Sequence, residues 1–220
     1  MKITERLLAA SKDIWDAYSE HPFVRGIAEG TLDKEKFKFY MVQDYLYLLD
    51  YARVFALGVA KAKDEASMKL FAGYVNQIFY GEMDIHRGYM QRLGISLEEA
   101  DAAKMSLDNR SYTSYMLKVA YEKGAAEIAV AILSCALSYE VIAQKIAADN
   151  PKAVAHPFYG EWVEGYANEA YHEANLELIA LTEKLCRGCS EEQYKELEEI
   201  FIACSRYEAS FWDMAWEMRP

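Results

Sequence analysis

The chain has 220 residues, and 24 lysines and arginines against 35 aspartates and glutamates give a formal net charge of −11 at pH 7. A protein that binds DNA or RNA needs a basic face to neutralise phosphates, so this charge argues against a nucleic-acid partner. Hydrophobic residues make up 53% of the chain, yet no stretch approaches the roughly 20 apolar residues of a membrane span. We therefore expect a substantial core and no membrane partner.

Cysteine and tyrosine usage indicates the compartment and the kind of ligand. Residues 1–20 lack the apolar segment of a secretory signal, and the 4 cysteines are too few for a disulfide scaffold. A reducing cytoplasm is therefore expected. Tyrosine occurs 17 times. Because a tyrosine combines an apolar ring with a polar hydroxyl, a tyrosine-rich core can hold a planar, polar ligand.

Apolar residues recur every three or four positions almost throughout, with no sustained alternation of period two, which predicts an all-α protein. Asp33 has the chemistry of a helix N-cap, and Gly94 that of a helix end. Ser96 and Ser190 each precede a glutamate or glutamine by three residues, the spacing of a capping box, so helices should begin there as well. The longer helices are expected over residues 3–19, 33–61, 64–93, 112–122, 125–148, 157–186 and 190–218.

No segment rich in glycine, serine or proline divides the chain, so residues 1–220 are expected to form a single domain. The tripeptide His21-Pro22-Phe23 is repeated as His156-Pro157-Phe158. Either the repeat is a relic of internal two-fold symmetry, or it marks two helix starts with proline in the first turn. The sequence leaves both explanations open.

Three carboxylates interrupt apolar stripes of the expected helices: Asp44, Glu82 and Glu208. An unpaired buried carboxylate costs several kcal/mol, so each needs a donor, a cation or a ligand. Each one alone is equally well explained as a satisfied core carboxylate. Together, beside so many tyrosines, they favour a polar cavity between helices.

The cysteines allow both structural and chemical roles. Cys135 lies on an inward stripe with Tyr139 four residues on, so the thiol and the hydroxyl share a face. A buried cysteine more often packs as a small hydrophobe and becomes a nucleophile only where a donor or base lowers its pKa. Cys186 and Cys189 have redox spacing, but they stand at a helix end beside Gly188 without a βαβ context, which favours a structural role.

Five segments in order resemble the TenA family, also called thiaminase II or aminopyrimidine aminohydrolase, over nearly the whole chain. They are His21-Pro22-Phe23 with Gly26, Gly30-Thr31-Leu32 and Phe37; Gln43-Asp44 with Tyr47; Arg110-Ser111-Tyr112-Thr113-Ser114-Tyr115-Met116; Cys135 with Tyr139-Glu140-Val141; and Tyr207-Glu208 with Phe211-Trp212. The resemblance implies a compact all-α fold of the haem-oxygenase type, without haem or other cofactor or metal, and a homotetramer. It implies hydrolysis of 4-amino-5-aminomethyl-2-methylpyrimidine to the 5-hydroxymethyl pyrimidine and ammonia, with thiamine as a slower substrate.

The resemblance also assigns roles to single residues. It makes Cys135 the nucleophile that adds to the pyrimidine ring and Glu208 the acid and base. Asp44 would hold the amidine edge of the ring. The other expected substrate-binding residues are three cavity tyrosines, Tyr112, Tyr139 and Tyr166, and two side chains that would stack on the ring, Tyr47 and Phe211. The presence of Cys135 places the chain in the cysteine-bearing branch of the family.

Two other functions remain open. Glu169 and His172 have the Glu-x-x-His spacing of helical di-iron proteins, but a di-iron centre needs a second such motif. Glu82 and His86 are spaced by four instead, so a metal-dependent oxygenase on the same fold is the weaker alternative. The second alternative is a regulatory protein that binds thiamine or a pyrimidine without turnover. The acidic net charge argues against a form of it that contacts DNA.

Overall fold

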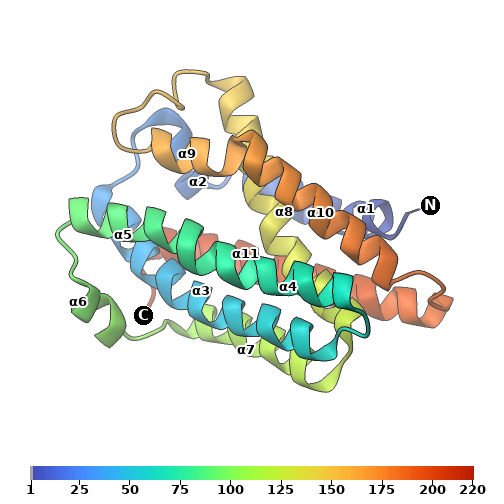
Figure 1. Ribbon diagram of the computed structural model, residues 1–220. Helices are drawn as coiled ribbons and strands as arrows, with labels where there is room; N and C mark the ends of the chain where they lie inside the picture. Colours follow the sequence, from blue (N-terminus) through green and yellow to red (C-terminus); the bar gives the residue numbers. More distant parts are fainter. Residues whose placement is uncertain (1) are drawn as a thin grey trace.

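The computed structural model describes residues 2–220, and over that range it consists of helices without strands (Figure 1). The all-α prediction is confirmed. The elements in chain order are α1 (Ile3–Tyr18), α2 (Pro22–Glu29), α3 (Lys34–Lys61), α4 (Glu65–Gln77), the π-helical turn η1 (Ile78–Glu82), α5 (Met83–Arg92), α6 (Leu97–Ala102), α7 (Leu107–Glu122), α8 (Ala125–Asp149), α9 (Gly160–Ala167), α10 (Glu169–Leu185) and α11 (Glu191–Glu217).

Helix starts agree with the capping chemistry of the sequence. The Asp33 carboxylate accepts a hydrogen bond from the main-chain N–H of Glu35 at 2.8 Å at the start of α3. The Ser96 hydroxyl accepts from the Glu99 N–H at 3.1 Å, and the Glu99 carboxylate accepts from the Ser96 N–H at 2.8 Å. Ser190 begins α11 with the same reciprocal pair. These side chains satisfy N–H groups that no helical carbonyl reaches.

Three expected helices differ from the structure. The helix over 64–93 contains the π turn η1, a local change in hydrogen bonding that the recurrence of apolar residues every three or four positions is too coarse to show. The prediction of a single helix over residues 157–186 is wrong, because the structure has two helices there, α9 and α10. Asn168 adopts an extended conformation between α9 and α10, and its side chain caps α10 by accepting from the Tyr171 N–H at 2.8 Å. Helix α7 begins at Leu107, five residues before the expected start, because Ser106 caps it.

The repeated His-Pro-Phe tripeptide acts locally at both sites. The His21 ring accepts from the Phe23 N–H at 3.2 Å and caps α2. The His156 ring accepts from the N–H groups of Phe158 and Tyr159 at 3.2 and 3.0 Å, in the turn that leads into α9. A capping role explains the repeat at both positions, so internal symmetry is not needed to account for it.

Helices α4, η1 and α5 form a nearly continuous rod that lies between α3 on one side and α10 on the other (Figure 1). Helix α8 packs against α3 and also against α9, α10 and α11. By length and composition α8 could cross a membrane, but 78% of its apolar window is buried inside the protein, so it is a core helix. The rod, α3, α8 and the α9–α10 pair together surround the site described next.

Candidate active site

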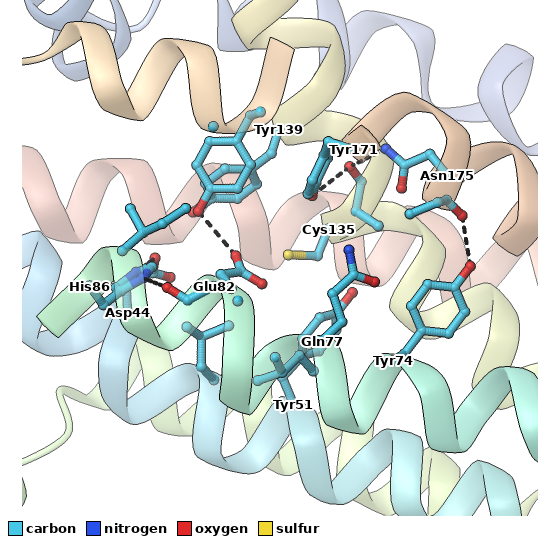
Figure 2. Close-up of a pocket in the computed structure, with 18 of the residues that line it drawn as sticks. Asp44, Tyr51, Tyr74, Gln77, Glu82, His86, Cys135, Tyr139, Tyr171 and Asn175 are labelled. Carbon is cyan, nitrogen blue, oxygen red and sulfur yellow. Dashed lines mark hydrogen bonds and ion pairs between the residues drawn. The ribbon is translucent and has the colours of Figure 1, made fainter. Parts of the chain in front are cut away.

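An elongated cavity of about 210 Å³ lies between α3, the α4–η1–α5 rod, α8 and the α9–α10 pair (Figure 2). Along α3 it is lined from Met41 to Phe55, a span of roughly 21 Å at about 1.5 Å per residue. Asp44 and His86 meet at one end, and the Phe55 and Tyr74 rings meet at the other, 5.1 Å apart. Cys135 projects between the two ends (Figure 2).

Asp44 is held by two neighbours through one of its oxygens. The Tyr40 hydroxyl donates to Asp44 Oδ2 at 3.0 Å, and His86 Nε2 lies 2.6 Å from the same oxygen. His86 Nδ1 lies 2.9 Å from the Glu82 carbonyl, and since a carbonyl only accepts, Nδ1 carries a proton. Burial opposes the charged form of His86, but the hydrogen bond and charge of Asp44 outweigh it and raise the pKa of His86. Oδ1 of Asp44 is left for a ligand.

The hydroxyl of Tyr40 connects three helices beside this pair. Trp162 of α9 donates its indole N–H to Tyr40 Oη at 3.2 Å, and Tyr139 Oη of α8 lies 3.3 Å from the same atom. A buried network of this kind fixes its members because each loses a partner when one moves. The Asp44 carboxylate is thus oriented from α3, α5, α8 and α9 together.

Cys135 of α8 lines the cavity and is 7% exposed. Burial raises the pKa of the thiol well above its ordinary value, and the nearby charge of Glu208 raises it further. A hydrogen bond with Tyr47 acts in the opposite direction. The resting group is therefore a thiol at neutral pH, and a nucleophilic role requires that its proton be removed during the reaction.

Glu208 of α11 lies behind the cavity wall and is 1% exposed. Burial, followed by the charge of Asp44, raises the pKa of Glu208 to about 8, and Tyr112 opposes this shift. Within residues 2–220, however, neither Glu208 Oε2 nor the Tyr112 hydroxyl has a hydrogen-bond partner of good geometry. Unsatisfied buried polar groups are rare in native proteins.

Glu82 ends the π turn and lines the cavity. Its Oε1 accepts a hydrogen bond from the Tyr166 hydroxyl at 3.0 Å. Burial raises the pKa of Glu82 to about 7; the His86 charge and the Tyr166 bond lower it, while the Asp44 charge raises it. A π turn inside an α-helix is frequently found at a functional site, and here it places a proton-bearing carboxyl in the cavity.

The structure brings most of the expected site residues to one place. Those that line the cavity are Asp44, Tyr47, Cys135, Tyr139 and Tyr166. The other three, Tyr112, Glu208 and Phe211, form a layer behind it: the Tyr47 ring lies 5.2 Å from the Tyr112 ring and 5.8 Å from the Phe211 ring.

Sequence reasoning missed His86 as the partner of Asp44, and it missed the lining residues Tyr51, Tyr74, Gln77, Tyr171 and Asn175. Tyr51 was on the apolar stripe of Asp44, so helical spacing could have indicated it. The pairing of His86 with Asp44 joins two helices, so the residue spacing within either helix does not predict it.

The four residues of the di-iron alternative do not form one site. His172 pairs with Glu140, His86 with Asp44, and Glu82 with Tyr166. Over residues 2–220, no three His, Cys, Asp or Glu side chains gather in an arrangement able to hold a metal ion. The geometry gives this alternative no support.

Comparison with known proteins agrees with the predicted family. Residues 8–218 match the TENA/THI-4/PQQC family. A Helicobacter pylori protein named aminopyrimidine aminohydrolase is 44% identical over 217 residues, which cover 99% of this chain and 100% of the relative.

Solved structures agree in fold. A crystal structure described as a TenA family transcription regulator from a Silicibacter species has a TM-score of 0.90 and 28% sequence identity, covering 98% of this chain and 96% of that one. A Shewanella denitrificans domain with a haem-oxygenase-like fold has a TM-score of 0.73 at 12% identity, covering 99% of this chain and 93% of that one. This second likeness confirms the expected fold type. The match along residues 8–218 and the full-length relative show that the chain belongs to the TENA/THI-4/PQQC family.

Proposed function

We propose that this protein is a hydrolase, an aminopyrimidine aminohydrolase that converts 4-amino-5-aminomethyl-2-methylpyrimidine and water into the 5-hydroxymethyl pyrimidine and ammonia. The observation that carries the proposal is one cavity lined by both the oriented Asp44 carboxylate and the Cys135 thiol, with Glu208 directly behind its wall. The name of the Helicobacter pylori relative supports the same reaction.

The Asp44 end of the cavity suits an aminopyrimidine ring. Asp44 Oδ2 is occupied by Tyr40 and His86, so Oδ1 can accept a hydrogen bond from the 4-amino group. The Tyr139 hydroxyl, whose proton is directed to Tyr40, can accept a hydrogen bond from the 4-amino group, and the Tyr47 ring can pack on the face of the pyrimidine. Fixing the ring in this way holds its carbons within reach of Cys135.

Cys135 then acts as the nucleophile. Sulfur adds to a ring carbon while the thiol proton passes to the neighbouring ring nitrogen, and the ring becomes electron-rich, which weakens the bond between the 5-methylene group and the leaving group. Departure of the amine leaves an exocyclic methylene that takes up water. Elimination of the thiol restores the aromatic ring and the free cysteine, so the enzyme is unchanged after one turnover.

Glu208 supplies the proton transfers. A pKa of about 8 keeps its carboxyl protonated near neutral pH, so it can give a proton to the departing amine. The carboxylate that results can take a proton from the water that replaces the amine. Tyr112 and Phe211 pack against the Tyr47 ring in the same layer.

We extend the proposal to thiamine as a slower substrate, which would yield the same hydroxymethyl pyrimidine and the thiazole alcohol. We also propose a cytoplasmic homotetramer that works without a cofactor. The roles of Tyr139 and Tyr166 as substrate-binding side chains belong to the same proposal.

Incubation of the purified protein with each compound tests the proposal, with the hydroxymethyl pyrimidine measured by chromatography and ammonia by a coupled assay. We expect both products from the aminomethyl compound in equal amounts. If both compounds bind but neither is converted, the protein is a pyrimidine-binding protein without turnover, and the hydrolase assignment is wrong.

A further inference from the structure

The cavity is longer than a single pyrimidine ring, and its far part has its own chemistry. We call this part the distal lobe; it is lined by Phe55, Tyr74, Tyr171, Asn175 and Leu178. Figure 2 shows Asp44, Glu82 and His86 on one side of Cys135 and Tyr74, Tyr171 and Asn175 on the other. A ring held at Asp44 with its reactive carbon near Cys135 can direct its 5-substituent toward the distal lobe.

The orientation of the Asn175 side chain is fixed by its neighbours. Its Nδ2 donates to Glu140 Oε2 at 2.6 Å and to the main-chain oxygen of Ala136 at 3.2 Å. Both partners are acceptors, so the amide atom facing them is the NH₂ group and both of its hydrogens are used. Asn175 is only 4% exposed, and its remaining atom, Oδ1, points toward the cavity in Figure 2.

The fixed hydroxyl donors of the distal lobe are directed away from a ligand. The Tyr74 hydroxyl donates to the carbonyl of Ala174 at 2.7 Å, and the Tyr171 hydroxyl donates to that of Ala136 at 3.2 Å. Among the groups that neighbours hold in place, the one left for a ligand is therefore the acceptor Asn175 Oδ1; the Gln77 amide also lines the cavity and is not held by a hydrogen bond within residues 2–220.

Within residues 2–220 no lysine or arginine lines the cavity. Of its acidic lining residues, Glu161 is paired with Arg92, which lies outside the lining, and burial raises the pKa of Glu82 to about 7. The one lining histidine, His86, is already paired with Asp44. An anionic group entering this cavity would lose its hydration without gaining a cation, which is strongly unfavourable.

We propose that the distal lobe is the leaving-group subsite of the enzyme, and that Asn175 Oδ1, held in place by Glu140, selects leaving groups that donate a hydrogen bond and carry no phosphate. This inference rests on the proposed reaction. The hydroxyethyl group of thiamine has such a donor. Thiamine monophosphate replaces that donor with an anion and is excluded, and the short amine of the aminomethyl pyrimidine does not reach Asn175. Asn175 is the specificity residue and Glu140 its positioning residue.

Equilibrium binding separates this inference from the reaction itself. Dissociation constants for thiamine and for the aminomethyl pyrimidine are measured by calorimetry in the Cys135→Ser protein, which is expected not to turn either over, with and without Asn175→Leu. We expect Asn175→Leu to raise the dissociation constant of thiamine roughly tenfold, which corresponds to the loss of about one hydrogen bond. The dissociation constant of the aminomethyl compound should stay within about twofold of its original value. Asn76→Leu, at an exposed amide outside the cavity, is the matched control and should change neither.

The positioning role of Glu140 has its own readout. Glu140→Ala releases the Asn175 amide and should weaken the binding of thiamine but not that of the aminomethyl compound. Glu140→Gln retains an oxygen that accepts from Asn175, so thiamine should bind it nearly as tightly as it binds the protein with Glu140. Equal weakening of both compounds by Asn175→Leu, or no change in thiamine binding, would overturn the inference.

A substrate series with the unmodified protein needs no variant. We expect kcat/KM for thiamine monophosphate to be roughly a hundredfold below that for thiamine, because the buried phosphate finds no cation. Comparable values would contradict the subsite. If the unmodified protein converts none of these compounds while the binding difference at Asn175 persists, the proposed reaction is wrong and the subsite remains.

Discussion

Cys135 is a thiol whose surroundings oppose its own ionisation. Burial and the charge of Glu208 both raise its pKa, and only the Tyr47 hydroxyl favours the thiolate. Such a group is inert in the empty site, which protects it from adventitious oxidation. It becomes reactive when a substrate can accept the proton or the negative charge that the addition produces.

Replacement of Cys135 by Ser should abolish turnover and leave ligand binding nearly intact, because a hydroxyl is a far weaker nucleophile of almost the same size. Product formation and calorimetric binding are the two measurements. Cys189→Ser, at a partly exposed thiol outside the cavity, is the control and should retain full activity. A Cys135→Ser enzyme with a near-normal rate would remove Cys135 from the mechanism.

Replacement of Glu208 by Gln keeps the shape of the side chain but removes the transferable proton. Turnover of the aminomethyl pyrimidine should fall by roughly two to four orders of magnitude, the usual range for general acid–base catalysis. The loss should be smaller for thiamine, whose thiazole leaves as a neutral ring without a proton. Equal losses on both substrates would assign Glu208 to a step that the two reactions share.

At the scale of elements, the π turn η1 decides where Glu82 lies. It is a one-residue insertion between α4 and α5, and it lets Tyr74 and His86 both reach the cavity although the rod is otherwise α-helical. The distortion is retained at a cost in helix geometry, as is common where function needs a special placement.

Deletion of Tyr80, which is 77% exposed, should convert η1 into a regular α-helical turn. We expect an unchanged or higher melting temperature, because the insertion is removed with little loss of packing, and at least about a tenfold loss of activity, because Glu82 moves relative to Cys135. Tyr80→Ala keeps the chain length and should behave as the unmodified protein. An active deletion variant would show that the π turn has no part in the reaction.

At the scale of the whole molecule, the buried carboxyls make stability depend on pH. The pKa values of Glu82 and Glu208 are raised from 4.5 to about 7 and about 8 in the folded state. Their contribution to stability is complete below about pH 4.5 and is lost as pH rises through those values, since the unfolded chain ionises more easily. The raised pKa of His86 acts in the same direction above its ordinary 6.5.

The free energy of unfolding, measured with denaturant from pH 5 to 9, should therefore fall by a few kcal/mol, because each pKa unit is about 1.4 kcal/mol. Glu208→Gln should decrease the slope and be more stable than the unmodified protein at pH 8.5. A flat profile, or the same slope in both proteins, would show that these carboxyls are not buried in the way described.

Periodicity and capping chemistry in the sequence determined the helical class, most helix ends and the inward carboxylates, because these depend on residues three or four positions apart. Asp44, Glu82 and Cys135 were therefore visible as polar groups on apolar stripes. The family motifs added roles that no spacing could supply. Only the tertiary structure decided that His86 holds Asp44, that Glu140 turns the Asn175 amide toward the cavity, and that Glu208 lies close enough to Cys135 to raise its pKa. Each of these contacts joins helices far apart in the chain, so the packing that creates it is absent from any local pattern.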